Sequence, residues 1–281
     1  MTRSDSKDTG ITPTGVRLLR KADLAAALEL STIAGWNQTA DDWSMLMNLA
    51  PEGCFGIEAD GALVATTTLL CYGQQLAWIG MVLTKPNYRG RGFARKLVTH
   101  ALRAADSMEV KTVKLDATDQ GQRLYESLGF EAEGSIERWT RPGPANPPLD
   151  VGESPCNELR EFYLIAFGAD RSAMLVELAK RSRVSKAKNA YLFARAGRVT
   201  AYLGPCVASD PESARALMTS TLRASPSTAW SWDLLPQNSN AQELASDLGF
   251  TRQRVLTRMG RGEKLKGRDD MTYAIAGFEL G

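Results

Sequence analysis

A short turn holds the residues best suited to chemistry, in the order Arg89-Gly90-Arg91-Gly92-Phe93-Ala94. An apolar run from Leu76 to Leu83 precedes it, and apolar positions at helical spacing follow it. The pattern predicts that the turn leaves a strand and opens a helix. A helix N-terminus offers unpaired N–H groups and partial positive charge. Arginines donate hydrogen bonds to phosphate oxygens, and glycines let a ligand approach the backbone closely. We therefore expect a pyrophosphate site here.

The spacing is neither that of a Walker loop nor Gly-x-Gly-x-x-Gly. After its Pro86-Asn87-Tyr88 lead-in, the turn resembles the acyl-CoA loop of the GNAT superfamily of N-acyltransferases, Gln/Arg-x-x-Gly-x-Gly/Ala. A second segment, Leu124-Tyr125-Glu126-Ser127-Leu128-Gly129-Phe130, resembles the family's Leu-Tyr-Glu-x-Leu-Gly-Phe. The resemblance covers about Val16 to Arg141. A solvated helix start would explain the two arginines but not the whole run.

The resemblance implies that an acetyl group passes from the sulfur of acetyl-CoA, a cosubstrate, to an amine that attacks directly in a ternary complex. It also implies that the loop binds the pyrophosphate, and that the strand before it offers backbone N–H groups to the thioester carbonyl and the pantetheine. The cofactor-binding residues expected on this basis are Met81, Val82, Leu83, Thr84, Arg89, Gly90, Arg91, Gly92, Phe93 and Ala94.

Two catalytic residues are expected. Tyr125 lies at the family's usual general-acid position and would protonate the thiolate, although a tyrosine packing at a helix edge is the alternative. The acceptor ammonium, with a pKa of roughly 10, must lose a proton before it attacks. Asp116, at the end of a strand beside the expected cleft, is the first candidate for that base, and a cap or hydrogen bond near Thr118 is its alternative reading.

Other bases are weaker candidates. Glu58 and Asp41 could serve, and so could a chain of water molecules with no dedicated base. His100 is the single histidine of the chain and lies deep in the helix after the loop, where we expect it to pack.

The acceptor site is expected between two N-terminal helices, at Trp36, Asn37 and Gln38. Amide groups beside an aromatic wall could hold a small polar amine. Alternatively, Thr39 or Asp41 caps the following helix and Trp36 packs into the core.

The fold class expected is α/β (α+β): a GNAT fold with a mixed, mostly antiparallel sheet flanked by helices, in tandem with a second, degenerate GNAT-like domain. Four prolines between positions 142 and 148 mark a boundary. The predicted divisions are a disordered tail (1–15), a catalytic GNAT domain (16–141), a proline-rich linker (142–154) and the degenerate domain (155–281).

The second half repeats the first weakly, because the segment 241–250 parallels 122–130 down to its Leu-Gly-Phe ending. At the position of the phosphate loop it carries Asp210, Pro211 and Glu212. These residues cap a helix well, but their carboxylates occupy its positive end. We expect no CoA site in this half, which would instead shape the acceptor pocket or pack against the first domain.

The amino-acid composition narrows the classes of function that remain. Of 281 residues, 43% are hydrophobic and 23% charged, and the net charge of +2 argues against nucleic-acid or membrane binding driven by bulk charge. Four scattered cysteines fit reduced thiols in the cytoplasm, and no cluster has metal-ligand spacing, so no metal is expected. A homodimer is possible.

The function favoured by these observations is acetyl-CoA-dependent N-acetylation of a primary amine on a small molecule. A protein or peptide N-acetyltransferase is the first alternative and would need an open groove. A non-catalytic acyl-CoA-binding sensor is the second, and the presence of Tyr125 argues mildly against it.

Overall fold

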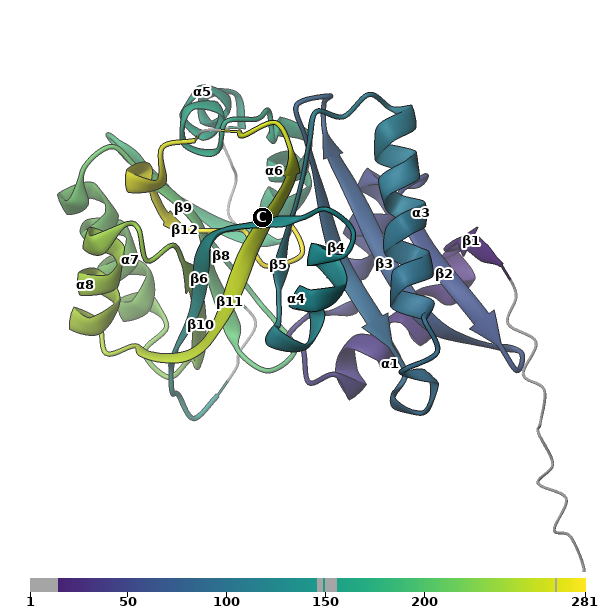
Figure 1. The fold of residues 1–281 in the computed structure, drawn as a ribbon. Coiled ribbons are helices and arrows are strands. Elements are labelled where there is room, and N and C mark those ends of the chain that lie inside the picture. Colours follow the sequence, from purple (N-terminus) through teal and green to yellow (C-terminus); the bar gives the residue numbers. More distant parts are fainter. Residues whose placement is uncertain (1–14, 146–148, 150–155, 266) are drawn as a thin grey trace, which may run out of the picture.

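The computed structural model describes residues 15–145, 149, 156–265 and 267–281 (Figure 1). Nearly all of the tail expected at 1–15 lies outside these residues, as do most of the predicted proline-rich linker and the side chain of Cys156.

The first half alternates strands and helices, and its Arg-Gly-Arg-Gly turn follows a strand and opens a helix, as the sequence pattern predicts. Its strands are β1 (Val16–Leu18), β2 (Cys54–Ala59), β3 (Ala62–Tyr72), β4 (Leu76–Thr84), β5 (Thr112–Ala117) and β6 (Glu131–Arg141). Its helices are η1 (Lys21–Asp23), α1 (Leu24–Ile33), α2 (Ala40–Leu49), η2 (Pro86–Tyr88), α3 (Phe93–Ser107) and α4 (Asp119–Glu126).

The second half follows a similar order. Its strands are β7 (Ser182–Ala187), β8 (Ala190–Arg195), β9 (Ala201–Ala208), β10 (Trp230–Leu234), β11 (Thr251–Gly262) and β12 (Thr272–Ala274). Its helices are α5 (Cys156–Phe167), α6 (Ser172–Ala179), α7 (Pro211–Ala224), α8 (Ser239–Asp247) and η3 (Asp269–Met271).

All these strands join one sheet in the order β1-β2-β3-β4-β5-β11-β6-β10-β9-β8-β7, with β12 paired to β9. The pairs β4–β5 and β9–β10 are parallel and the other pairs are antiparallel. The prediction of a mixed, mostly antiparallel sheet flanked by helices is confirmed.

The two halves exchange one strand each. β11, from the second half, pairs with β5 of the first half, and β6, from the first half, pairs with β10 of the second. Figure 1 shows β6 and β11 side by side at the centre of the molecule, and their shared register runs from Thr251↔Thr140 to Gly260↔Glu131. Neither half therefore has a complete sheet within its own residues.

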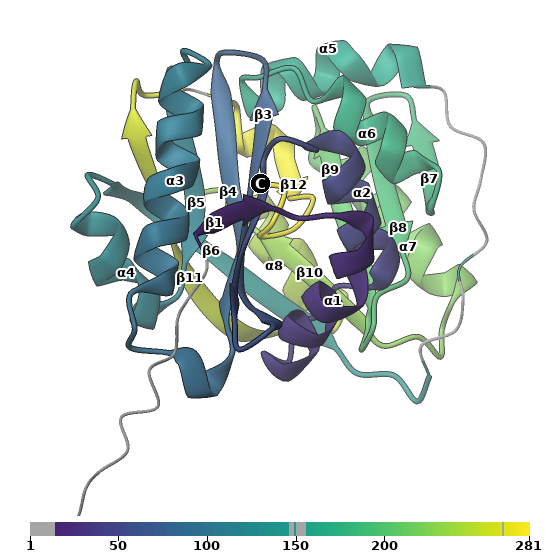
Figure 2. The same cartoon turned by 90° about the vertical axis from the view of Figure 1, so that its right-hand side faces the viewer.

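Apolar side chains cover both faces of this sheet. Helix α3 packs on one face of the first half through residues such as Leu97 and Ala101. The opposite face carries α1 and α2 (Figure 2), whose Trp43 and Leu46 belong to a cluster that continues into α6 of the second half through Leu178. One hydrophobic core therefore spans both halves.

Candidate active site

Strands β4 and β5 diverge halfway along their length and open a cavity. Their parallel pairing covers only Leu76–Trp78 against Thr112–Lys114. Just beyond, Met81 adopts a positive φ of 49°, and the hydroxyl of Thr66 donates to its carbonyl at 2.9 Å. This bulge turns β4 away from β5, and the stretch from Ile79 to Thr84 lines a cavity of about 430 Å³.

The Arg-Gly-Arg-Gly loop lies at one end of this cavity. Gly90 and Gly92 have φ angles of 75° and 78°. A Cβ on either would meet nothing within 4 Å, so the loop needs glycine for its backbone conformation rather than for space within the chain. No side chain caps α3, which leaves its first N–H groups open, and Arg89 and Ala94 line the cavity.

Tyr125 lies in the same cavity wall, on α4. Its side chain is 7% exposed, and burial raises the pKa of its phenol to about 12. One turn earlier, a Cβ on Gly121 would lie 2.9 Å from the Tyr125 ring, so Gly121 makes room for that ring. The hydroxyl therefore stays protonated at neutral pH and is able to donate a proton.

Asp116 also lines the cavity, but its carboxylate is engaged. Arg258 of β11 donates to both of its oxygens, at 2.8 and 2.9 Å. Burial raises the pKa of the Asp116 carboxyl while Arg258 opposes that rise. The ion pair joins the two halves across the β5–β11 ladder.

The three residues predicted to bind the acceptor do not all line the cavity. Trp36 and Gln38 line the cavity, whereas Asn37 does not. The Asn37 amide donates to the carbonyl of Thr200 at 2.9 Å and accepts from the N–H of Val199 at 2.7 Å. Asn37 therefore fastens the α1–α2 connection to the second half.

The weaker base candidates lie elsewhere. Glu58 bonds to Arg17, Asp41 is exposed on α2, and neither lines the cavity. His100 packs edge-on against Phe55, with 4.7 Å between the ring centroids.

Sequence reasoning missed Glu279, a buried carboxylate in the cavity wall. Gln38 donates to it through Nε2 at 2.9 Å, and Arg195 lies 3.8 Å away. Burial raises the pKa of the Glu279 carboxyl to about 7; Arg195 opposes the rise and Asp42 adds to it. An acid with a pKa this close to neutral is able to accept and release a proton under ordinary conditions.

Contacts with β3 and β4 of the first half fix the segment that carries Glu279. Tyr72 donates to the carbonyl of Leu280 at 2.6 Å, and Trp78 donates to that of Phe278 at 2.8 Å. A Cβ on Gly80 would lie 2.8 Å from the carbonyl oxygen of Glu279, so only glycine permits this approach to β4. The sequence of this segment contains no recognisable motif, because its apolar residues are of the types found in any protein core.

The corresponding groove of the second half is filled by the chain itself. Strands β9 and β10 pair only at Ala201↔Trp230 and Tyr202↔Ser231. Beyond that point β12 pairs with β9, and the N–H of Ile275 donates to the carbonyl of Asp233 in β10 at 2.9 Å. At the nearby helix start, the Asp210 carboxylate accepts from the N–H of Ser213 at 2.7 Å, as the capping pattern predicts.

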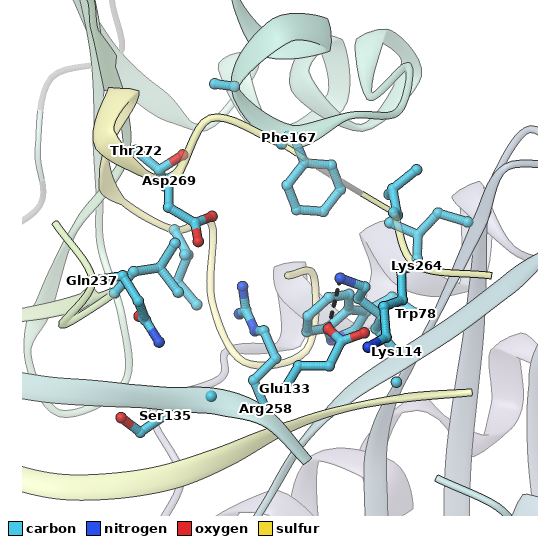
Figure 3. Close-up of a pocket in the computed structure, with 18 of the residues that line it drawn as sticks. Trp78, Lys114, Glu133, Ser135, Phe167, Gln237, Arg258, Lys264, Asp269 and Thr272 are labelled. Carbon is cyan, nitrogen blue, oxygen red and sulfur yellow. Dashed lines mark ion pairs between the residues drawn. The ribbon is translucent and has the colours of Figure 1, made fainter. Parts of the chain in front are cut away.

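A larger cavity, of about 550 Å³, lies beside β11 and is lined by none of the catalytic, cofactor-binding or acceptor residues predicted from the sequence (Figure 3). Trp78, Lys114 and Arg258 line it, and Lys114 pairs with Glu133 at 2.7 Å. The smaller cavity, which adjoins the open helix N-terminus and holds Tyr125, is therefore the candidate active site.

Metal binding and membrane insertion are two further properties that the described residues address. Within the described residues, no cluster of three or more histidine, cysteine, aspartate or glutamate side chains could hold a metal ion. No helix in the same part of the chain is long and apolar enough to cross a membrane.

Comparison with protein families gives two matches. Residues 23–130 match the model described as "Acetyltransferase (GNAT) family", and residues 161–274 match one described as "Acetyltransferase (GNAT) domain". The chain is 29% identical over 173 residues to the uncharacterized N-acetyltransferase YitH of Bacillus subtilis, a match that covers 58% of this chain and 60% of YitH.

Solved structures share the fold of the whole chain. A protein of Pyrococcus horikoshii with a provisional acetyltransferase assignment is 20% identical, with a TM-score of 0.83 over 100% of this chain and 99% of its own. A GCN5-related N-acetyltransferase of Kribbella flavida is 16% identical, with a TM-score of 0.56 over 90% of this chain and 71% of its own.

Proposed function

The chain belongs to the GNAT acetyltransferase family, with two of its domains in tandem, and we propose that it transfers an acetyl group from acetyl-CoA to a primary amine of a small molecule. One observation carries this proposal. A single cavity joins the open N-terminus of α3 to a phenol, Tyr125, and a buried carboxylate, Glu279.

Acetyl-CoA would bind with its pyrophosphate at the loop Arg89–Ala94, where the helix N-terminus and the guanidinium groups favour anions. The pantetheine would run along Met81–Thr84, in the space that opens where β4 leaves β5. Backbone N–H groups of this stretch would polarise the thioester carbonyl, because beyond Trp78 no described strand pairs with β4 on the side of β5.

Proton transfers would occur at both ends of the reaction. Glu279 takes a proton from the acceptor ammonium, and the resulting amine attacks the thioester carbonyl carbon. The tetrahedral intermediate collapses by breaking the C–S bond, and Tyr125 supplies the proton that leaves with the thiol. The second proton that the attacking nitrogen must lose then passes to the Tyr125 phenolate through solvent and restores the phenol. The products are the N-acetyl amine and CoA, formed in a ternary complex with no acyl-enzyme.

We assign the base to Glu279 rather than to Asp116. Both carboxylates are buried, but Asp116 is held at both oxygens by Arg258, whereas the nearest guanidinium to Glu279 is 3.8 Å away. Taking a proton at Asp116 would break a buried ion pair, which is costly. Asp116 therefore acts as a positioning residue that fixes β11 beside β5.

Enclosure favours a small acceptor over a protein substrate. The cavity wall contains Trp36 and Gln38 from the first half and Phe278 and Glu279 from the second. A peptide substrate would need a groove that continues along the surface, whereas the segment carrying Glu279 is held against β4 and borders this end of the cavity.

The test is CoA release from acetyl-CoA across polyamines, amino acids, aminoglycosides, aryl amines and short peptides, with Glu279→Gln as the matched variant. We expect turnover on at least one small amine and its loss in the variant, with acetyl-CoA binding retained. Turnover on peptides alone would favour the protein-acetyltransferase alternative. Acetyl-CoA binding without any turnover would favour the sensor.

A further inference from the structure

The ionisable groups at the acceptor end of the cavity are paired, with one exception. Arg138 donates to both oxygens of Asp233, at 2.7 and 2.6 Å, and Asp116 is held by Arg258. Arg254 lines the same cavity, and no described carboxylate lies within 4.0 Å of its guanidinium.

Arg254 also has a like charge beside it. It lies opposite Arg138 in the β11–β6 register, and Arg138 already engages Asp233. Arg254 is an exposed residue, and Asp119 is the other carboxylate whose charge acts on it. Partial burial and the neighbouring Arg138 both lower the pKa of Arg254. An anion placed beside Arg254 would offset the repulsion from Arg138, and the exposed guanidinium is accessible to a ligand in the cavity that it lines.

A second group awaits a hydrogen-bond donor. Gln38 is 9% exposed and lines the cavity, and its Oε1 is buried with no hydrogen-bond partner in the described part of the chain. Its Nε2 holds Glu279 at 2.9 Å. An unmet buried acceptor beside a carboxylate is suited to the N–H donors of an ammonium group.

The two recognition groups belong to one continuous wall. Arg254 lies beside Arg138, whose guanidinium covers the Phe278 ring at 4.4 Å from its centroid, and Phe278 precedes Glu279 in the chain. A ligand that touches the carboxylate and the free guanidinium must carry both a cationic and an anionic group.

We propose that the acceptor is a zwitterionic aminocarboxylate, such as an amino acid, with its ammonium at Gln38 and Glu279 and its carboxylate at Arg254. This inference rests on the proposed acetyl transfer and names its substrate class. Charge stays balanced throughout. The neutral zwitterion enters a site where Glu279 and Arg254 offset each other, and after proton transfer the aminocarboxylate anion faces Arg254 beside a neutral Glu279.

The same balance disfavours two other acceptors. A plain alkylammonium would leave Arg254 uncompensated once Glu279 had taken its proton. A polyamine would add further positive charge next to Arg254 and Arg138. Both are therefore expected to be poor substrates.

The experiment compares amino acids with the matching amino-acid amides and decarboxylated amines, in the wild-type chain and in Arg254→Gln. We expect the wild type to favour the carboxylates by about 10- to 100-fold in kcat/KM, the scale of one hydrogen bond to a charged group. In Arg254→Gln this preference collapses through KM for the carboxylate substrates, while the low activity on amides and amines persists.

Arg252→Gln is the matched control, because Arg252 lies on the same strand but pairs with Glu137 and does not line the cavity. Equal activity on amines and carboxylates would overturn the inference and leave the acetyl transfer standing. A raised KM for acetyl-CoA in Arg254→Gln would overturn it too, by assigning Arg254 to the cofactor phosphates. Absence of turnover on every amine would instead refute the proposed function.

Discussion

At the scale of single residues, the proposed reaction depends on two groups whose pKa values are raised by burial. Glu279 would accept a proton, and Tyr125 would donate one. Burial raises the pKa of Glu279 to about 7 and that of Tyr125 to about 12. A base works when it has lost its proton and an acid when it has kept its own. Between these two values both groups are in the form that the reaction needs.

The pH dependence of the rate follows from these shifts. Glu279 is protonated and inactive below its pKa, so kcat/KM is expected to rise with pH through about 7 and then level off. In Glu279→Gln the rate should fall by about 10² or more, and the rise near pH 7 should disappear. A variant with a lowered rate but an unchanged pH profile would show that another group is the base.

Replacing Tyr125 by Phe removes the acid and keeps the ring. Because a thiolate is already a fair leaving group, we expect kcat to fall by only about 10- to 100-fold. Acetyl-CoA binding, measured by calorimetry, should not change. An unchanged kcat would return Tyr125 to its alternative reading as a packing residue.

The site residues that could be predicted from the sequence are those that belong to short motifs with fixed spacing. Arg89, Ala94 and Tyr125 lie in short motifs, and each reaches the cavity. Glu279 and Arg254 could not be predicted, because they come from the second half and no local pattern indicates a contact across more than a hundred residues. The sequence predicts that Asn37 contacts substrate, but its amide instead bonds to Val199 and Thr200. These partners also lie more than a hundred residues away, so no local pattern indicates the contact.

At the scale of elements, the bulge in β4 and the chain segment beside it work together. The bulge opens the space in which we propose that the cofactor binds, and Gly80 lets the backbone of Glu279 approach. Gly80→Ala would place a Cβ 2.8 Å from the carbonyl oxygen of Glu279. We expect kcat to drop sharply with acetyl-CoA affinity retained; loss of affinity alone would show that β4 itself had moved.

The Arg258–Asp116 pair joins β11 to β5 and supports a stability prediction. Asp116→Asn leaves Arg258 without its partner, and breaking a buried pair costs about 3–5 kcal/mol. Since Arg258 borders the larger cavity and keeps some water, we expect the lower end of that range in urea unfolding (Figure 3). The double variant Asp116→Leu with Arg258→Met should recover part of the loss; no recovery would mean that the charges were not the cause.

Most helices and strands could be predicted from their own residues, because periodicity, turns and caps are local. Thr39, one of the two caps that the sequence allows for α2, is the residue that caps it. Strand partners are not local. The residues of β6 and β11 do not indicate that either strand pairs across the halves.

At the scale of the whole molecule, strand exchange makes the halves one structural unit. We infer that residues 16–141 and 155–281, although each has the pattern of a GNAT domain, unfold together. Removing β11 would expose β5, and removing β6 would expose β10.

Calorimetry of the intact chain checks this inference. We expect one transition whose van't Hoff and calorimetric enthalpies agree. Two separated transitions would show that the halves are independent domains despite their shared sheet.

Strand β12 and the residues after it explain why the proposed cofactor groove exists in only one half of the described structure. In the second half β12 occupies the space between β9 and β10, and the chain then continues to place Glu279 in the cavity of the first half. The same segment therefore closes one groove and completes the other.

The most direct test of this account is a calorimetric titration of the intact chain with acetyl-CoA, compared with Arg89→Ala. The account predicts one molecule bound per chain, with affinity lowered in the variant because a phosphate contact is lost. Two molecules per chain would show that β12 does not close the second groove. No binding at all would contradict the assignment of the loop Arg89–Ala94, on which the proposed reaction depends.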